Sequence, residues 1–358
     1  MGPSSKSWRT RISDRRFHLK ESSWIARAGV EVRIEQIMNQ FRKLMAAGLV
    51  AIVLTALLPA AAPAEMLAIS HSDDAIRLLK QQVNSDPTNA DAHALLCRVY
   101  FQLGEWDNAI AEGERAVQLN PNVSSYHLWL GRAYGRKAET VNLAYAFVLA
   151  RKVVREFEHA SELAPGDWSA RRDLADFYVQ APIVVGGGEY KAQRLANDTQ
   201  ARDAVGASII RAMIAERKKN TAEAERQYGI AIQRSSGAAG PWLDLARLYR
   251  NGNQWDKFDD AVKMALSSTH KNSEDLFDTG ELLGGTGRML PQAAEAFRLY
   301  LKDGTTDGHA DAFRAHYLLG RILEQLGDRQ GAIGEYRFSL TLASGYRPAQ
   351  DALRRLGA

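Results

Sequence analysis

The sequence predicts an all-α protein, a solenoid of about seven stacked helical hairpins, and two observations lead to this prediction. The first is a pattern that begins with Tyr100, Gly104 and Ala116 and returns with Tyr134 and beyond. Its spacing is about 34 residues or a close multiple, the length of one helical hairpin. The second is that so short a unit cannot bury its apolar stripe alone and must pack against its neighbours. We therefore expect a row of hairpins without a single central core.

The predicted elements follow this repeat in chain order. A half-repeat marked by Ala75 opens the array and ends at Pro87. Seven hairpins follow, marked by Ala90–Asn122, Tyr126–Pro165, Trp168–Ala192, Val205–Ala238, Trp242–Ala265, Gly280–Phe297 and Leu319–Tyr336. A last helix over Tyr346–Leu356 is expected to cap the array, because Pro348 suits its first turn.

Small residues occupy one slot in the first helix of every hairpin, where two helices are expected to cross closely. The slot holds Cys97, Gly131, Ala175, Ala212, Ala246, Gly280 and Gly320. Cys97 is therefore interpreted as a small buried thiol in preference to a reactive one. It is the only cysteine, so the chain has no intrachain disulfide and no cysteine-based zinc site. Gly104 and Gly327 are expected to end first helices in the left-handed conformation.

Two hairpins depart from the plain repeat. Pro121 and Pro165 are 44 residues apart, so the second hairpin carries about ten extra residues around Thr140–Phe147. In the third, the segment Gln180–Tyr190 reads QAPIVVGGGEY and replaces the tight turn. Proline followed by three glycines is not helical, and the apolar Ile183–Val185 is expected to need cover.

The amino-terminal region predicts export. Leu44–Leu58 is an uncharged apolar run that follows two basic residues, and Ala62–Ala64 fits the small-x-small rule for cleavage before Glu65. We expect a periplasmic or secreted protein, with Met38 as its natural start. The expected division is a disordered or wrongly assigned extension over 1–37, a signal peptide over 38–64 and a helical-repeat domain over 65–358. The alternative is an uncleaved signal that anchors the protein in the inner membrane through residues 44–58.

The charge balance argues against nucleic acid as a partner. The whole chain of 358 residues has a formal net charge of +4. Residues 1–64 hold 10 of the 46 basic and 4 of the 42 acidic residues, which leaves 36 basic and 38 acidic residues in 65–358. The basic excess thus lies in the segment expected to be removed, and the mature chain is close to neutral.

The repeat has a recognisable internal order. Most hairpins contain an aromatic residue or histidine, a leucine, a small residue, tyrosine and glycine, then alanine, an aromatic residue and alanine, and a closing proline. These segments resemble tetratricopeptide repeats over roughly Asp73–Ala358. The stretches HLWLGRAYGRKAE and FYVQAPIVVGGG further resemble exported bacterial members of that family whose role is unknown. The resemblance implies a solenoid of the tetratricopeptide type with a C-terminal capping helix, acting as a non-catalytic scaffold for protein partners.

In that family the first helices line the concave face, which selects a set of candidate binding residues. The selected arginines are Arg98, Arg132, Arg136, Arg172, Arg247, Arg250 and Arg321. Guanidinium groups bind carboxylates in bidentate geometry, so acidic or carboxylate-bearing peptide segments are the expected ligands. The competing interpretation is that these arginines pair only with acidic residues of the next hairpin.

Other candidates favour plainer interpretations. Gly186–Gly188 lacks the strand and the motif of a nucleotide-binding loop, so an interhelical insertion is expected, although an enzyme with this loop in its site is a third hypothesis. His93, His127 and His316 share one slot in three hairpins and are expected to pack, not to bind metal.

We expect no catalytic residue, cofactor or metal. The alternative function is self-assembly or docking to an envelope complex through residues 180–190 or the repeat ends. The oligomeric state stays open.

Overall fold

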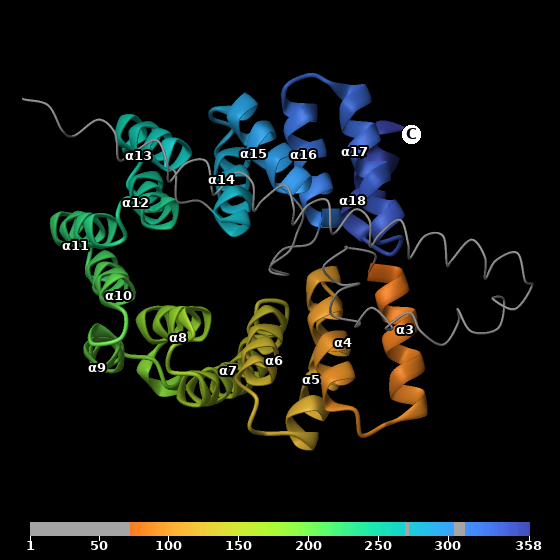
Figure 1. Cartoon of the computed structure of the whole chain (residues 1–358), viewed down its shortest axis with the longest axis horizontal. Helices are drawn as coiled ribbons and strands as arrows, with labels where there is room; N and C mark the ends of the chain where they lie inside the picture. The colour runs from red at the N-terminus through yellow and green to blue at the C-terminus, as the bar shows by residue number, and fades with distance from the viewer. Residues whose placement is uncertain (1–71, 269–271, 304–311) are drawn as a thin grey trace, which may run out of the picture. The chain divides into compact units, whose positions relative to one another are not determined.

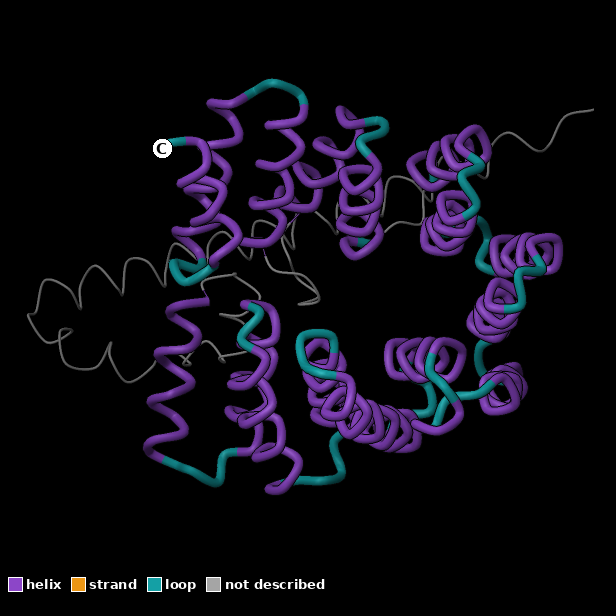
Figure 2. The backbone as a smooth tube through the Cα atoms, turned by 180° about the vertical axis from the view of Figure 1, so that it is seen from behind, coloured by secondary structure: helices purple, strands orange, loops and turns teal. Residues whose placement is uncertain are grey.

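The computed structural model describes residues 72–268, 272–303 and 312–358. All of them belong to one compact unit, Ala62–Ala358. The predicted extension and signal peptide, 1–64, lie outside the described residues. Within the described ranges every regular element is a helix, as the tube in Figure 2 shows. None of these helices is both long enough and apolar enough to cross a membrane.

The helices follow one another as antiparallel pairs, each packed on its neighbours in the chain (Figure 1). The half-repeat is the single helix α3, Ser72–Ser85. The predicted all-α solenoid is confirmed, and the described part of the chain holds seven hairpins. They are α4 (Ala90–Leu103) with α5 (Trp106–Leu119), α6 (Ser124–Ala138) with α7 (Leu143–Leu163), α8 (Trp168–Gln180) with α9 (Glu189–Gln200), α10 (Ala204–Arg217) with α11 (Thr221–Arg234), α12 (Ala239–Asn251) with α13 (Trp255–Ser267), α14 (Ser273–Thr286) with α15 (Leu290–Asp303), and α16 (Ala312–Gln325) with α17 (Arg329–Leu342). The cap is α18, Arg347–Leu356.

Local chemistry sets the helix ends. The side chain of Asn89 accepts a hydrogen bond from the backbone N–H of Ala92 and begins α4, which satisfies one of the free amides of the first turn. Asp203 begins α10 in the same way. Gly104 and Gly327 have φ angles of 79° and 84°, so both take the predicted left-handed conformation.

The small-residue slot brings helices into close contact, as predicted. A Cβ atom added to Gly131, Gly280 or Gly320 would lie 2.6 Å from a ring atom of Phe157, Phe297 or Tyr336, respectively. In the first hairpin the arrangement is reversed, because a Cβ on Gly113 of α5 would lie 2.9 Å from the sulfur of Cys97. Each crossing therefore has room for one large side chain at most.

Cys97 itself is 1% exposed. Burial and, to a smaller extent, the nearby Glu112 raise the pKa of its thiol to about 12. A thiol with such a pKa stays protonated at neutral pH and is a poor nucleophile.

The apolar core is divided among four clusters, as expected for a solenoid. All of their residues come from 75–356. The two ends of the array also touch: Asp73 accepts a hydrogen bond of 2.9 Å from the backbone N–H of Ser344, and Leu103 packs on the cluster that contains Phe313 and Tyr346. The described core clusters therefore lie entirely within the predicted repeat domain, 65–358.

The two irregular hairpins are found where the sequence places them. Helix α7 has 21 residues, whereas its partner α6 has 15. In the third hairpin, Ile183–Val185 forms one turn of 3₁₀ helix, η1, and Gly186 and Gly188 have φ angles of 102° and 138°.

The apolar residues of η1, which we expected to be buried by neighbouring side chains, are buried only in part. Val185 is buried, but Ile183 is 81% and Val184 70% exposed. The reason is geometric, because a single 3₁₀ turn can direct only one of three consecutive side chains toward α7.

Candidate functional site

A cleft of about 500 Å³ is lined by the first helices of the second to sixth hairpins, which are α6, α8, α10, α12 and α14. We call it the polar cleft. Its charged lining consists of Arg132, Arg172, Asp173, Asp203, Asp244, Arg247, Glu274, Asp275 and Asp278. Helical periodicity explains the gathering, because residues three apart, such as Asp244 and Arg247 on α12, lie on one side of a helix.

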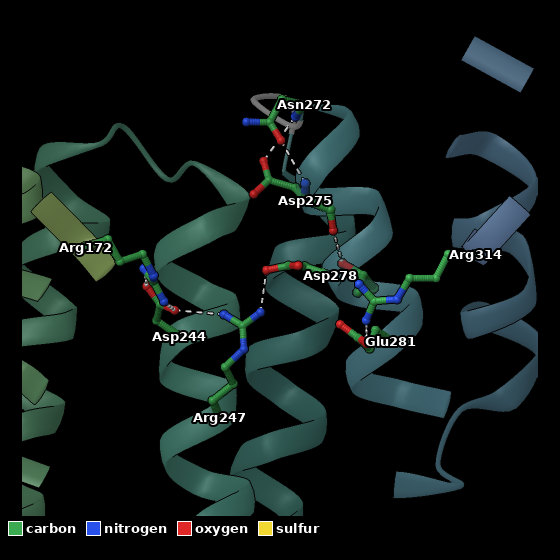
Figure 3. A network of polar contacts seen from close by, with 9 residues as sticks. Arg172, Asp244, Arg247, Asn272, Asp275, Asp278, Glu281 and Arg314 are labelled. Atoms are coloured by element: carbon green, nitrogen blue, oxygen red, sulfur yellow. Dashed lines mark hydrogen bonds and ion pairs between the residues drawn. The ribbon is translucent and has the colours of Figure 1, made fainter. Parts of the chain in front are cut away.

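A chain of ion pairs crosses this cleft (Figure 3). Arg172 of α8 donates two hydrogen bonds, of 2.9 and 2.6 Å, to the carboxylate of Asp244. Arg247 donates one of 2.8 Å to the same carboxylate and another to Asp278 of α14. Asp244 is only 4% exposed. These contacts join three helices that lie far apart in the sequence.

The ion pairs are reflected in the pKa values. Burial alone would raise the pKa of Asp244, but Arg172 and then Arg247 outweigh it and hold the pKa below its ordinary value. The carboxylate of Asp244 raises the pKa of Arg172. For Asp275 the balance is the opposite: burial and the neighbouring Asp278 and Glu274 raise its pKa, against one hydrogen bond from the backbone of Asn272. The cleft therefore holds more negative charge than it neutralises.

A second cleft, of about 550 Å³, lies over the first three hairpins. We call it the aromatic cleft; its lining includes Phe101, Trp129, Arg132, Arg136, Glu139, Phe157, Asp173, Asp176 and Phe177. Arg132 and Asp173 line both clefts. The two hollows are therefore neighbours along one surface.

Arginines and aromatic rings alternate at the aromatic cleft. The guanidinium carbons of Arg98 and Arg132 lie 5.2 and 4.7 Å from the ring centre of Trp129. Arg136 lies 5.3 Å from the ring centre of Trp106. Phe101 packs edge-on against both tryptophans, at 5.4 Å. Stacking of this kind uses the face of a guanidinium and fixes its position, while its N–H donors lie along the edge.

Carboxylates also reach these arginines. Arg132 donates a hydrogen bond of 2.5 Å from Nε to Asp173. Arg136 pairs at 2.6 Å with Glu139, three residues along, and both side chains are exposed, so the pair contributes little stability. Burial, with a smaller effect from Asp173, raises the pKa of Asp176, although Arg172 opposes the shift.

The seven predicted arginines thus fall into three groups. Arg132 and Arg136 line the aromatic cleft, and Arg98, which is not part of its lining, stacks on its Trp129; Arg132 also lines the polar cleft with Arg172 and Arg247. The competing interpretation, pairing with acidic residues of another hairpin, describes Arg132, Arg172 and Arg247. Arg250 and Arg321 line neither cleft.

The three histidines of the shared slot have partners that sequence reasoning missed. The Nδ1 atoms of His93, His127 and His316 lie 2.6, 2.7 and 2.6 Å from carboxylates of second helices, and those carboxylates are Glu112, Glu156 and Glu335. In two of the three hairpins the glutamate follows its histidine by 19 residues, and this repeated spacing is the signal in the sequence that could have indicated the pairing. Among the described residues no group of His, Cys, Asp and Glu has the geometry to hold a metal ion.

The backbone amides of the triple-glycine segment are already engaged. Gly186, Gly187 and Gly188 donate hydrogen bonds to the carbonyls of Ile183, Pro182 and Tyr178, at 2.9, 3.2 and 2.8 Å, respectively. A phosphate cradle needs such amides to point at the ligand. The segment is therefore an interhelical connection in this structure.

Comparison with known families agrees with this architecture. Residues 71–134 and residues 277–356 each match a family model described as tetratricopeptide repeat. These two segments are tetratricopeptide repeats, as the sequence pattern predicted. Repeats of this kind are protein-interaction modules, so the chain is a scaffold for protein–protein contacts. Neither matching model is that of an enzyme.

Solved structures with similar folds are distant in sequence. The yeast Tom70 structure is 14% identical with a TM-score of 0.45, and the match covers 80% of this chain and 58% of that one. A repeat protein from Thermus thermophilus is 18% identical with a TM-score of 0.40, over 52% and 94%. One from Parabacteroides merdae is 14% identical with a TM-score of 0.40, over 73% and 99%. No curated protein matches the chain.

Proposed function

We propose that the repeat array binds an extended, carboxylate-bearing segment of a partner protein, and that the aromatic cleft is where the carboxylates bind. The single observation that carries this proposal is the stacking of Arg98, Arg132 and Arg136 on the rings of Trp129 and Trp106. Arginine and tryptophan dominate the energetics of protein interfaces. A stacked guanidinium also loses little further freedom when a carboxylate binds it.

Charge balance favours this cleft over the polar cleft. In the polar cleft six carboxylates surround three arginines, and Arg172 and Arg247 are already bonded to Asp244 and Asp278. An acidic ligand there would have to displace buried ion pairs, which is costly. The aromatic cleft is lined by two arginines and three carboxylates, with Arg98 stacked on its Trp129, and among the described residues the carboxylate paired with Arg136 is the exposed Glu139 at the end of the same helix.

Binding of a defined probe tests the proposal. We expect a fluorescent peptide rich in Asp and Glu to bind fragment 65–358 in a polarisation assay, more tightly than lysine or glutamine peptides of equal length. The double substitution Arg98→Glu with Arg136→Glu should weaken binding at least tenfold. Arg194→Glu with Arg354→Glu is the control, because both arginines are highly exposed and line neither cleft.

Two outcomes would count against the proposal: equal affinity for the lysine peptide, or the same loss in the control pair. A circular dichroism spectrum of each variant separates lost binding from lost folding. The single variant Arg136→Glu provides a further check, because Arg136 is exposed and its substitution should leave the packing intact.

We also propose that this binding takes place in the cell envelope. The support is the apolar run Leu44–Leu58 and the cleavage pattern that ends at Ala64. Fractionation of cells followed by amino-terminal sequencing tests it. A soluble periplasmic or secreted form beginning at Glu65 is expected, whereas an intact form in the membrane fraction would favour the anchored alternative.

A further inference from the structure

The exposed large apolar side chains of the described residues are concentrated in the two irregular hairpins. Eleven such side chains are exposed in all. Eight of them come from α7, η1 and α9, and these are Leu143, Tyr145, Phe147, Val148, Leu163, Ile183, Val184 and Tyr190. The segments that depart from the plain repeat are thus the segments that expose apolar surface, which calls for an explanation.

The beginning of α7 extends past the helix that it packs on. Contacts between α6 and α7 align Ser124 with Ala160 and Gly135 with Val153, so the end of α6 at Ala138 lies beside residue ~149 of α7 by helix geometry. The first six residues, 143–148, therefore project beyond α6 by about 9 Å.

The projecting turns are apolar around more than half of the helix. At about 100° per residue, Leu143, Tyr145, Phe147 and Val148 point in directions that span roughly 200°. Leu143 is 88% exposed. A partner helix would cover only a narrow stripe of such a surface, whereas a fluid apolar phase can cover all of it.

The turn η1 lies on the same side of α7. Its Gly186 approaches Val154, because a Cβ atom there would lie 3.0 Å from Val154 Cγ1. Val154 follows Leu143 and Phe147 at helical spacings of eleven and seven residues, which places all three on one side of the helix. The exposed side chains of Ile183 and Val184 therefore continue the apolar surface of α7.

Basic residues follow directly along the helix. Between Leu143 and Arg155 the sequence contains Arg151, Lys152 and Arg155 and no acidic residue. Arg155 bonds to the buried carboxylate of Glu156, and Lys152 bonds to Glu114 through a half-exposed pair. These cations follow the projecting residues by about one to two turns toward the middle of α7. From there their long side chains would reach lipid phosphates when the projecting end is inserted.

We propose that the beginning of α7, together with η1, binds the surface of an anionic lipid bilayer. The projecting length of about 9 Å matches the 5–10 Å depth at which interfacial helices bury their apolar side chains. Two copies of this surface are a poorer fit, because a two-fold contact sets Arg151, Lys152 and Arg155 against the same cations. This proposal is independent of ligand binding at the aromatic cleft.

Vesicle sedimentation tests the proposal with fragment 65–358, which contains all residues of the four described core clusters and lacks the apolar run 44–58. We expect it to pellet with vesicles of phosphatidylcholine and phosphatidylglycerol (about 3:1) and much less with phosphatidylcholine alone. Leu143→Ser with Phe147→Ser should reduce the bound fraction at least tenfold. Met264→Ser with Leu326→Ser is the matched control, since both side chains are exposed elsewhere in the array.

Each result bears on the proposal. Arg151→Glu should remove the preference for anionic vesicles but leave the thermal unfolding temperature unchanged. Failure of the fragment to pellet with anionic vesicles would overturn the proposal, as would equal loss of binding in the control pair. Light scattering tests whether a second copy of the chain binds this surface instead. If the fragment does not bind vesicles, and its apparent mass rises with concentration unless Leu143 is replaced by serine, the surface is a contact between two copies.

Discussion

At the scale of single residues, Asp244 is the most constrained charge in the polar cleft. It is buried and accepts hydrogen bonds from both Arg172 and Arg247. The three groups depend on one another. Without the carboxylate of Asp244, the two guanidinium groups would lie close together and repel each other. The stability that such a site adds is modest, but removing one member leaves buried charge uncompensated.

The substitution Asp244→Asn tests this dependence. We expect it to lower the free energy of unfolding by about 3 kcal/mol in urea titrations at pH 7. The ordinary pKa of an aspartate is 3.8 and that of Asp244 lies lower in the folded protein. The stabilisation is therefore complete above pH 3.8 and is lost as the pH falls through the folded-state value, so the deficit of the variant should shrink in acid. Asp260→Asn, at a highly exposed position, should change stability by less than about 0.5 kcal/mol.

At the scale of the helix pair, the recurring histidine–glutamate contact fastens a first helix to its second. His127 and Glu156 are both buried, and the second ring nitrogen of His127 lies 2.8 Å from the carbonyl of Pro121. Burial lowers the pKa of His127, but Glu156 and Pro121 outweigh it and raise the pKa above its ordinary value. Burial raises the pKa of Glu156, but His127 and Arg155 outweigh it, so the net shift is downward.

This pair predicts a pH-dependent stability. The share from His127, whose pKa is raised, is complete below pH 6.5 and is lost as the pH rises through its folded-state pKa. Glu156→Gln should therefore destabilise the protein by about 2 kcal/mol near pH 6 and by less near pH 9. Thermal melts across this range measure the difference. Glu139→Gln, which removes a carboxylate from the exposed pair with Arg136, should show no such trend.

The sequence predicted helix pairs better than it predicted contacts between them. The spacing of Tyr100 and Gly104 and the small-residue slot fix hairpins locally, and local patterns are visible in a sequence. The bond from Arg172 to Asp244 spans 72 residues and depends on how successive hairpins are inclined, which no local pattern records. For the same reason the sequence selected Arg98, Arg132 and Arg136 but not the tryptophans on which they stack.

At the scale of the whole repeat domain, the contact between the two ends changes the expected mode of unfolding. A plain solenoid has only neighbour contacts, so loss of its last helix loosens the adjacent hairpin and little else. Here Leu103 of α4 packs on the cluster that holds Tyr346, at the start of α18. The first hairpin thus shares a small core with the last.

Removal of residues 345–358 tests this coupling by hydrogen exchange. We expect amide protection to fall in α16 and α17, and also at the end of α4 near Leu103, while α8 to α11 change little. Loss confined to α16 and α17 would contradict a role for the end contact. Removal of Gly357 and Ala358 alone is the control, because both are exposed and follow the last helix.

The close crossings within hairpins also limit how this sequence can diverge. Where Gly280 meets Phe297, a larger residue on the first helix requires a smaller one on the second. The first hairpin has this reversed arrangement, because Cys97 is on its first helix and Gly113 is on its second. Divergence at this crossing should then proceed by compensated double substitutions. Among homologous proteins the two positions should co-vary, and a chimaera that inherits only one helix of a pair should fold poorly.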